Sequence, residues 1–505
     1  MERKLIARNI GTSLALQIVT MISGFIIPKV ILSYFGSDVN GLISSINQFL
    51  NYIQLLEGGL GGVIMAALYK PLADGDMQKI SAVINATRSF FRKLAVIFAV
   101  YMAGVAVIYP LVVKTGFSFA YSAALVVVLG LHLFVQYFFS LTYKLLLNAD
   151  RKVYYVSLTQ IIIVGLNMVF VIICAKLFND ILIIKIASAL IFFIQPLMYG
   201  LYVKKKFRLD KSIPPDNKAL SQRWDGFGIN LAYFVHTNTD VIILTIFSTL
   251  AEVSVYSVYL MVINAMKNLV MAVSQAIVPS FGKVLVSDNK DEINKKFELY
   301  ELGMYFLTAV IFTCGMFLIT PFVKVYTANI HDADYNRVVF GYILTAAEMV
   351  YCFRDPYIAA TYAAGHFRQV TKFAVVEVII NLAVSLALVK PLGIVGVAIG
   401  TLVSMLYRQV SHVFYLKNNI LYRSPVHYFK KAGIYGGSIA LIIFISIKLL
   451  NTNVSGYIGW GFLAVKEAVI CGVIILAVTV IFYREPLKKL IGNKIKLKSR
   501  RNSDA

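Results

Sequence analysis

The sequence predicts an all-α integral membrane protein with about 14 transmembrane helices. Of its 505 residues, 59% are hydrophobic and 14% are charged, and the mean hydropathy is +0.76. Soluble domains are less apolar and carry about 25% charged residues. Apolar runs of about 20 residues, long enough to span the hydrocarbon core as a helix, recur along the whole chain. Because lipid cannot satisfy backbone polar groups, we expect these runs to be helical.

The predicted spans follow one another with short connections. The first follows Arg3, Lys4 and Arg8, but it is too long for a signal peptide and lacks a small-residue cleavage site, so we expect an uncleaved first helix. The four cysteines stand singly in apolar runs, which indicates neither a disulfide framework nor a metal site. The approximate spans are 10–34, 40–68, 90–113, 119–144, 153–178, 180–203, 226–248, 252–282, 299–324, 338–363, 369–390, 393–417, 429–450 and 457–483.

The distribution of basic residues predicts the orientation. With the N-terminus in the cytoplasm, most of the 48 Lys and Arg residues fall on cytoplasmic segments, so we expect both termini inside. The formal net charge of +23 is concentrated in 204–223 and in the tail at 484–501. These segments predict attraction to anionic lipids on the cytoplasmic face. They do not indicate nucleic-acid binding, because no aromatic residues interleave the charges.

An internal repeat emerges when the chain is shifted along itself by about 213 residues. This offset carries six helices, an even number, so the two copies would have the same orientation in the membrane, as in parallel-repeat transporters. We predict a first lobe at 1–203, a basic linker at 204–225, a second lobe at 226–417, two further helices at 418–484 and a basic tail at 485–505. The shift aligns Ser44 with Ser257, Asn51 with Asn264 and Gln54 with Lys267.

We take Lys29, Lys267, Arg354 and Arg408 as the candidate cations inside the membrane. A charge at the centre of a membrane helix costs about 2.5 to 3.5 kcal/mol, so such residues usually face a cavity, a partner or a substrate. The alternative, that each reaches an interface or pairs internally, stays open. Lys29 and Arg408 lie near span ends, and Arg354 adjoins Asp355.

Polar uncharged residues and acids also follow helical spacing. Asn47, Asn51 and Gln54 share one face of the second predicted helix, where amides can either line a cavity and match sugar hydroxyls or join helices. The acids Asp240, Glu348 and Glu377 belong to the second lobe, where plain helix pairing is the alternative to a functional role. Glu377 and Asn381 are one turn apart, and Thr401 lies on the next helix.

Several stretches, in this order and spacing, resemble the multidrug/oligosaccharidyl-lipid/polysaccharide flippase superfamily. The resemblance covers the first twelve predicted helices, and within the superfamily the chain is most similar to the Wzx-type polysaccharide flippases. The drug-extruding branch typically has twelve spans, so the two further helices favour the lipid-linked sugar branches. The stretches are ILSYFGSDVNGLISSINQFL (31–50), LEGGLGGVI (56–64), NTDVIILTIFSTLAEVSVYSVYL (238–260) and KPLGIVGVAIGTLVS (390–404).

The resemblance implies a V of two lobes that translocates an undecaprenyl-pyrophosphate-linked oligosaccharide by alternating access. It implies no catalytic residues and no cofactor other than a coupling ion, Na⁺ or H⁺. In lipid II flippases, a sister family, sodium binds an acid on helix 7, an amide and an acid on helix 11, and a Thr on helix 12. Asp240, Glu377, Asn381 and Thr401 resemble that set, except that here the helix 11 acid precedes the amide.

These considerations give two sets of site residues. We expect substrate binding by Lys29, Asn47, Asn51, Gln54, Asn264, Lys267, Arg354 and Arg408, and cation coupling by Asp240, Glu348, Glu377, Asn381 and Thr401.

The expected setting is a bacterial cytoplasmic membrane, with a monomeric protein serving surface polysaccharide synthesis beside a polymerase and glycosyltransferases. Two alternatives remain. One is a multidrug or metabolite antiporter of the same superfamily. The other is a polyprenyl-dependent glycosyltransferase or polymerase, which would need catalytic groups in an outer loop, where the longest offers only His331, Asp332 and Asp334.

Overall fold

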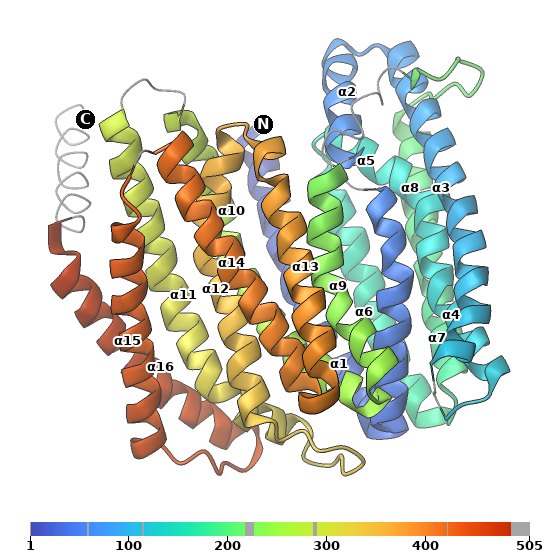
Figure 1. Cartoon of the computed structure of the whole chain (residues 1–505). Coiled ribbons are helices and arrows are strands. Elements are labelled where there is room, and N and C mark those ends of the chain that lie inside the picture. Colours follow the sequence, from blue (N-terminus) through green and yellow to red (C-terminus); the bar gives the residue numbers. More distant parts are fainter. Residues whose placement is uncertain are drawn as a thin grey trace. The chain divides into compact units, whose positions relative to one another are not determined.

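The structure, a computed structural model, describes residues 2–57, 60–113, 116–217, 227–285, 290–421 and 423–485. Every regular element in these ranges is helical, which confirms the predicted all-α membrane fold (Figure 1). The chain divides into two compact units. Unit 1 comprises Met1–Val258 and Asn329–Ala333, and unit 2 comprises Tyr259–Ala328 and Asp334–Ala505. The limits predicted for the lobes, linker and tail stay predictions.

Unit 1 is built around one apolar core to which most of its helices contribute, with Leu42, Ile64, Phe98 and Leu146 among the fully buried side chains. Its elements are α1 (Glu2–Asn51), η1 (Tyr52–Leu56), α2 (Leu60–Asp74), α3 (Met77–Val112), α4 (Phe119–Val135), η2 (Gln136–Ser140), α5 (Leu141–Ala149), α6 (Val153–Leu177), α7 (Ile181–Phe192), α8 (Ile194–Lys206), α9 (Phe227–Phe247) and the first part of α10 (Leu250–Leu285).

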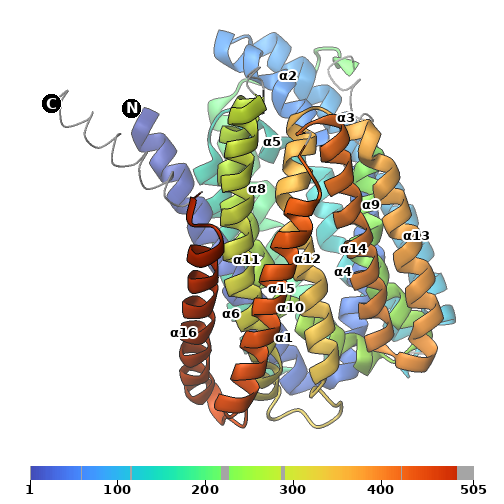
Figure 2. The ribbon, with the colours of Figure 1, turned by 60° about the vertical axis from the view of Figure 1, so that its left-hand side comes forward.

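Unit 2 contains the rest of α10 and six further helices. Of these, α14 packs closely against both α12 and α13, and α11, α15 and α16 lie side by side (Figure 2). Their bounds are α11 (Lys290–Tyr326), α12 (Val338–Ala363), α13 (Phe367–Leu392), α14 (Ile394–Asn419), α15 (Val426–Leu449) and α16 (Gly456–Phe482).

A kink at Gly36 separates the first two predicted spans inside α1. Gly36 has a φ of +80°, a conformation that residues with a Cβ rarely adopt. A Cβ at this position would also lie 2.6 Å from a carboxylate oxygen of Asp332. Ser37 donates its backbone N–H and its hydroxyl to that carboxylate, both at 2.6 Å. The loop residue Asp332 therefore fixes the turn between the two spans.

Two predicted spans are not continuous α-helices. In the second, α1 ends at Asn51 and a 3₁₀ helix, η1, precedes α2, while in the fourth a π-helix, η2, separates α4 from α5. Tyr137 of η2 donates its hydroxyl to the carboxylate of Glu57, just after η1, at 3.1 Å. The sequence did not indicate these changes of helix type, because apolar composition does not distinguish α, 3₁₀ and π hydrogen bonding.

Eleven helices of the described part are long and apolar enough to cross a membrane. One of them, Lys4–Leu55, contains the first predicted span and the start of the second. The helix α12 is not among them, and its predicted span carries Glu348, Arg354 and Asp355, whereas α9 supplies only the shorter segment Asn238–Phe247. Each predicted span nevertheless coincides with one helix or a run of adjoining helices. The chain is therefore a multi-pass membrane protein.

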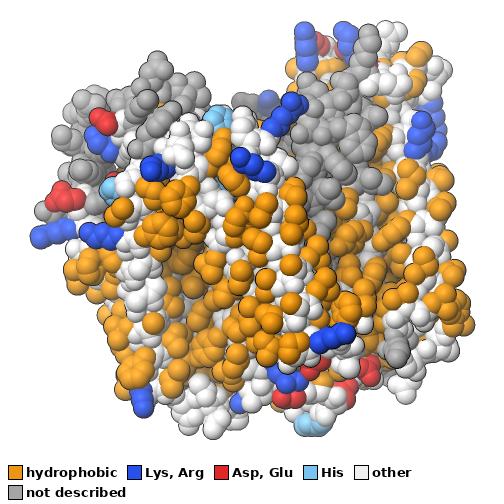
Figure 3. Space-filling model, viewed as in Figure 1, with side chains coloured by type: hydrophobic (Ala, Val, Ile, Leu, Met, Phe, Trp, Pro, Cys, Tyr) orange, Lys and Arg blue, Asp and Glu red, His pale blue; other side chains and the backbone are white. Residues whose placement is uncertain are grey.

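The surface agrees with this conclusion. Apolar side chains cover the midsections of the helices, and Lys and Arg gather toward helix ends (Figure 3). Leu111 of α3 is 72% exposed and Ile458 of α16 is 79% exposed. Large apolar side chains at such exposure are stable in a bilayer and unfavourable in water.

One hydrogen bond of unit 1 joins two residues whose separation is close to the predicted repeat length. Asn40 donates its side-chain N–H to the Ser254 hydroxyl at 2.8 Å, and the two residues are 214 positions apart. The next residue, Gly41, lies so close to the Leu250 carbonyl that a Cβ would collide with it.

Candidate functional site

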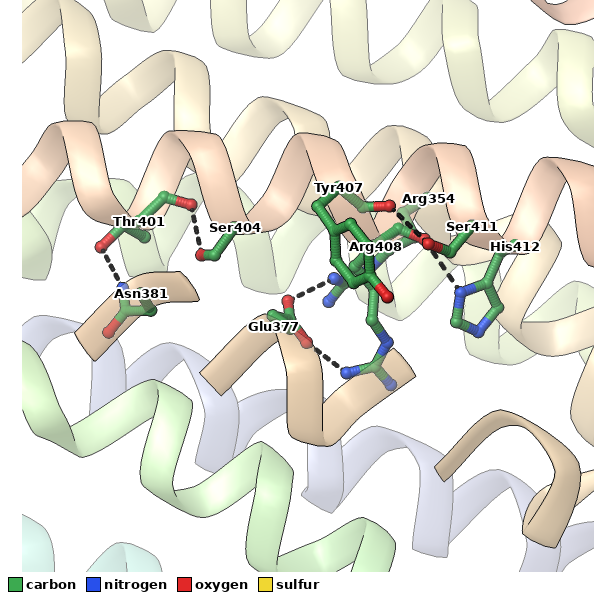
Figure 4. A network of polar contacts seen from close by, with 9 residues as sticks. All are labelled: Arg354, Glu377, Asn381, Thr401, Ser404, Tyr407, Arg408, Ser411 and His412. Carbon is green, nitrogen blue, oxygen red and sulfur yellow. Dashed lines mark hydrogen bonds and ion pairs between the residues drawn. The ribbon is translucent and has the colours of Figure 1, made fainter. Parts of the chain in front are cut away.

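Three helices of unit 2 hold a buried network of charges. Glu377 on α13 stands between Arg354 on α12 and Arg408 on α14 (Figure 4). Nη1 of Arg354 lies 2.6 Å from Oε1 of Glu377, and Nη1 of Arg408 bonds the other carboxylate oxygen, Oε2. Glu377 is 1% exposed and both arginines are also buried. One carboxylate thus holds two guanidinium groups from two neighbouring helices.

The network carries one positive charge in excess, because two guanidinium groups share one carboxylate. The Nε of Arg354 and the Nε of Arg408 have no hydrogen-bond partner among the described residues. Removing charges from water costs several kcal/mol per ion, which is offset only when the remaining donors are also satisfied. An anion with several oxygens would supply the missing acceptors and the missing charge.

A second polar layer lies one turn further along α13. Asn381 donates its side-chain N–H to the Thr401 hydroxyl at 3.1 Å, and the Ser404 hydroxyl donates to the Thr401 carbonyl at 2.9 Å (Figure 4). The residues predicted for cation coupling therefore have different partners in this structure. Glu377 is occupied by arginines, whereas Asn381 and Thr401 bond each other.

A glycine brings these two helices together. A Cβ at Gly400 would collide with the Ser385 hydroxyl and would lie 3.1 Å from the Asn381 carbonyl oxygen. Because Glu377, Asn381 and Ser385 recur at every fourth position, they form one stripe that α13 buries against α14. The close approach lets the short side chains of Asn381 and Thr401 meet.

Lys267 and Glu348 form a second ion pair of unit 2. Nζ of Lys267 on α10 lies 3.0 Å from a carboxylate oxygen of Glu348 on α12. Both side chains are mostly buried. The ring of Tyr351 is 5.1 Å from the Lys267 ammonium and 4.9 Å from the Arg354 guanidinium, within cation–π range of both. Tyr351 therefore connects this ion pair to the arginine network, and three of the four predicted cations belong to one assembly.

Asp355 does not take the role that its sequence neighbour suggested. It accepts hydrogen bonds from the hydroxyls of Tyr300, at 3.0 Å, and Ser274. The ion pair of Arg354 is made with Glu377 instead. Adjacent residues on a helix point about 100° apart, so the pairing suggested by adjacency was wrong.

The remaining predicted residues have these surroundings. In unit 1, Lys29 and Asn47 are half-buried on α1, and Gln54 donates to Asn51 at 3.2 Å. Asp240 on α9 is buried and accepts from the Tyr256 hydroxyl at 2.8 Å. Asn264 is half-buried on α10 in unit 2. The functional roles of all these residues stay predictions.

Sequence reasoning overlooked further buried charges. Glu301 of α11 accepts from Lys431 at 2.6 Å, from Arg423 at 2.8 Å and from the Tyr357 hydroxyl, which attaches α15 to α11 and α12. Glu467 of α16 is fully buried and receives the Cys471 thiol at 3.2 Å. The available signal was a single acidic residue in each of the two predicted spans 299–324 and 457–483.

No metal-type cluster accompanies these networks. Among the described residues, no group of three or more His, Cys, Asp or Glu side chains is arranged to hold a metal ion. A sodium ion would need five or six oxygen ligands. Both carboxylate oxygens of Glu377 are occupied by guanidinium groups, so a cation would bind there only after an arginine had left.

Comparison with solved structures identifies the fold. The chain is similar to the lipid II flippase MurJ in its inward closed conformation, with a TM-score of 0.70 and 14% identity over 94% of this chain and 100% of that one. It is also similar to an inward-facing multidrug resistance MATE family transporter of the MOP superfamily, with a TM-score of 0.66 and 13% identity over 79% and 95%. The eukaryotic MATE transporter AtDTX14 aligns with a TM-score of 0.51 and 13% identity over 93% of this chain and 99% of that one.

At this level of identity the similarity establishes the fold, which is that of the MurJ and MATE membrane transporters. The similarity to MurJ covers almost the whole chain, whereas that to the inward-facing MATE transporter leaves about a fifth of it unmatched. A scan of protein-family models found no match. A search of curated proteins also found none.

Proposed function

We propose that this protein is a flippase that moves a polyprenyl-pyrophosphate-linked oligosaccharide from the cytoplasmic to the outer leaflet by alternating access. The observation that carries the proposal is the buried Arg354–Glu377–Arg408 network, with its excess positive charge and unused guanidinium donors. Guanidinium groups bind phosphate oxygens in a bidentate manner, and a pyrophosphate offers several such oxygens. The similarity in fold to a lipid II flippase supports the same substrate class.

The network also suggests how transport couples to a cation. A pyrophosphate that binds Arg354 and Arg408 competes with Glu377 for the same N–H donors. Glu377, once released, becomes available to a proton or to sodium beside Asn381. Anion and cation would then alternate on opposite members of one network, which is a reciprocal coupling between two ligands. A membrane potential negative inside adds about 2.3 kcal/mol per charge per 100 mV toward outward movement of the anion.

The second candidate is a multidrug antiporter, which the similarity to MATE transporters favours. An organic cation would meet Arg354, Arg408 and Lys267 in unit 2, and an excess of positive charge repels such a ligand. A membrane enzyme is the third candidate. It would make or break a covalent bond in the sugar chain, which transport does not.

Purified protein in sealed vesicles separates the three functions. A polyprenyl-pyrophosphate oligosaccharide with a fluorescent sugar is placed in both leaflets, and a membrane-impermeant quencher or glycosidase reports the fraction on each side. We expect the protein to accelerate exchange between leaflets and to leave the lipid chemically unchanged. Transport of an organic cation without lipid exchange would reject the flippase in favour of the antiporter, and a change in glycan length would indicate the enzyme.

A further inference from the structure

A cavity of about 840 Å³ lies in unit 1 between α3 and the chain that follows α8. Four basic side chains line it, and they come from two separate segments. Arg88, Arg92 and Lys93 belong to α3, whereas Lys211 belongs to the segment after α8. None of the carboxylates among the described residues lines it.

The segment after α8 is fastened to α3 by specific hydrogen bonds. The Asn85 side chain donates to the carbonyl oxygens of Asp210 and Ile213, both at 2.9 Å. The backbone N–H of Asp210 donates to the Ser81 hydroxyl at 3.1 Å, and that of Asp216 donates to the Ala82 carbonyl at 3.1 Å. We call residues 210–216 the strap. Because the strap is fixed at both of its ends, Lys211 is held beside the arginines of α3.

The basic side chains of α3 are held in place, yet retain donors for a ligand. Arg88 donates to the Tyr143 hydroxyl at 3.2 Å, and the Arg92 guanidinium lies 5.3 Å from the ring of Phe138 in the π-helix η2. The nearest carboxylate in sequence, Asp210, accepts from the side chain and backbone of Ser212, and these hydrogen bonds lower its pKa. That carboxylate is thus turned toward its own strap.

The same face of α3 continues as an apolar surface. Beyond Lys93 the exposed positions are Val96, Val100, Val107 and Leu111, which recur at helical spacing and are all at least 54% exposed. Val96 and Leu111 are separated by about 22 Å along the helix, within the roughly 30 Å of the hydrocarbon core. The basic group therefore lies at the level of lipid phosphates. Lys and Arg gather over the part of α3 nearest α2, next to this apolar surface (Figure 3).

We propose that this cavity binds the phosphate of an anionic phospholipid from the predicted cytoplasmic leaflet, with an acyl chain along Val96 and Val100. Its charge is complementary to the cavity, and its chain matches the adjoining face of α3. A phospholipid reaches this cavity from the side of the protein while its acyl chains remain in the bilayer. The bound phosphate bridges Lys211 of the strap to Arg92 and Lys93 of α3, so it fixes the strap more firmly to the helix. The site does not depend on what the protein transports.

The test is lipid binding to the full chain in neutral detergent, counted by native mass spectrometry during titration with phosphatidylglycerol or with phosphatidylcholine. The triple variant Arg92→Gln, Lys93→Gln, Lys211→Gln should bind phosphatidylglycerol at least tenfold more weakly, since each basic residue near the surface contributes measurably to attraction of anionic lipid. Phosphatidylcholine binding should not change. Asn85→Leu, which releases the strap but keeps every charge, should also weaken phosphatidylglycerol binding.

The matched control is Lys204→Gln, Lys205→Gln, Lys295→Gln, which removes three exposed positive charges elsewhere. Its binding of phosphatidylglycerol should change less than twofold. Equal losses of phosphatidylglycerol binding in the two triple variants would show attraction to net charge alone and would overturn the site. Unchanged phosphatidylglycerol binding in the first triple variant would also overturn it. A polyprenyl pyrophosphate that loses affinity in the first triple variant while phosphatidylglycerol does not would assign the cavity to that lipid instead. The single variant Lys211→Gln, on the strap surface, repeats the test with the smallest disturbance of folding.

Discussion

Replacing Glu377 by Gln should destabilise unit 2 strongly. The substitution keeps the size of the side chain and removes the only carboxylate that the structure pairs with Arg354 and Arg408. Both guanidinium groups are buried, so they would keep their desolvation cost without the attraction that offsets it. Removing one partner of a buried ion pair typically costs about 3 to 5 kcal/mol. Here two pairs share the lost partner, so we expect the upper part of that range.

A triple variant separates the stability of the network from its function. In Arg354→Met, Glu377→Ile, Arg408→Met all three charges disappear together, and apolar replacement of a buried ionic triad is often neutral or stabilising. The predicted repeat agrees with this expectation, because the shift of 214 residues that aligns Asn167 with Asn381 places Ile163, itself buried, at the position of Glu377. We expect the triple variant to be within about 1 kcal/mol of the unmodified protein. We also expect it to have lost lipid exchange.

The assay measures unfolding and transport on the same preparations. Denaturation of purified protein in mixed micelles gives the change in stability, and lipid exchange in vesicles gives the activity. The expected order of stability is unmodified protein, triple variant, then Glu377→Gln, with exchange present only in the unmodified protein. A triple variant that exchanges the lipid at the normal rate would refute the cationic site. A Glu377→Gln variant of normal stability would refute the energetic argument.

Three further predictions concern helix packing and ion pairs. Gly400→Ala should lower the free energy of unfolding by about 1 to 3 kcal/mol, because its Cβ would meet α13. Gly433→Ala, where no atom lies within 4 Å of the added Cβ, should change it by less than about 0.5 kcal/mol. Thermal unfolding compares the two variants, and equal losses of stability would contradict the close approach of the helices. Lys267→Met and Glu348→Leu should each destabilise the protein more than the double variant does, with a coupling energy of about 1 to 3 kcal/mol in a double-mutant cycle. If the two losses of stability simply add, the ion pair contributes little. Glu301→Gln should speed hydrogen exchange in α15, whose Lys431 it holds, while exchange in α13 stays the same; equal acceleration in both helices would indicate general unfolding instead.

The helices could be predicted because membrane insertion imposes a simple rule on composition. A span needs about 20 apolar residues, and the hydrocarbon core excludes irregular backbone that is exposed to lipid. The rule does not cover backbone that is buried in protein. The 3₁₀ segment Tyr52–Leu56 and the π-helix Gln136–Ser140 are therefore invisible to it, although the contact between Tyr137 and Glu57 joins them.

The charged residues of the site could be predicted, but not their partners. A charge inside an apolar run is conspicuous, which singled out Arg354, Arg408 and Glu377 from the sequence. Their pairing depends on which helices pack together, and the partners of Glu377 lie 23 and 31 positions away. Adjacency in the sequence suggested Asp355 for Arg354, and the resemblance to lipid II flippases suggested a cation for Glu377, because helical periodicity relates only residues three or four positions apart.

The two predicted copies of the repeat share an asparagine but differ in charge. At a shift of 214 residues, Asn381 aligns with Asn167, whereas Glu377 aligns with Ile163 and Arg408 with Ile194. The positions of the predicted first copy that correspond to Glu377 and Arg408 are therefore apolar. Folding of such a lobe does not require a charged triad, and a buried triad is at best a weak source of stability. Packing does not need the Arg354–Glu377–Arg408 ions, so we expect them to serve a ligand. Because the network has an excess of positive charge, that ligand would be an anion.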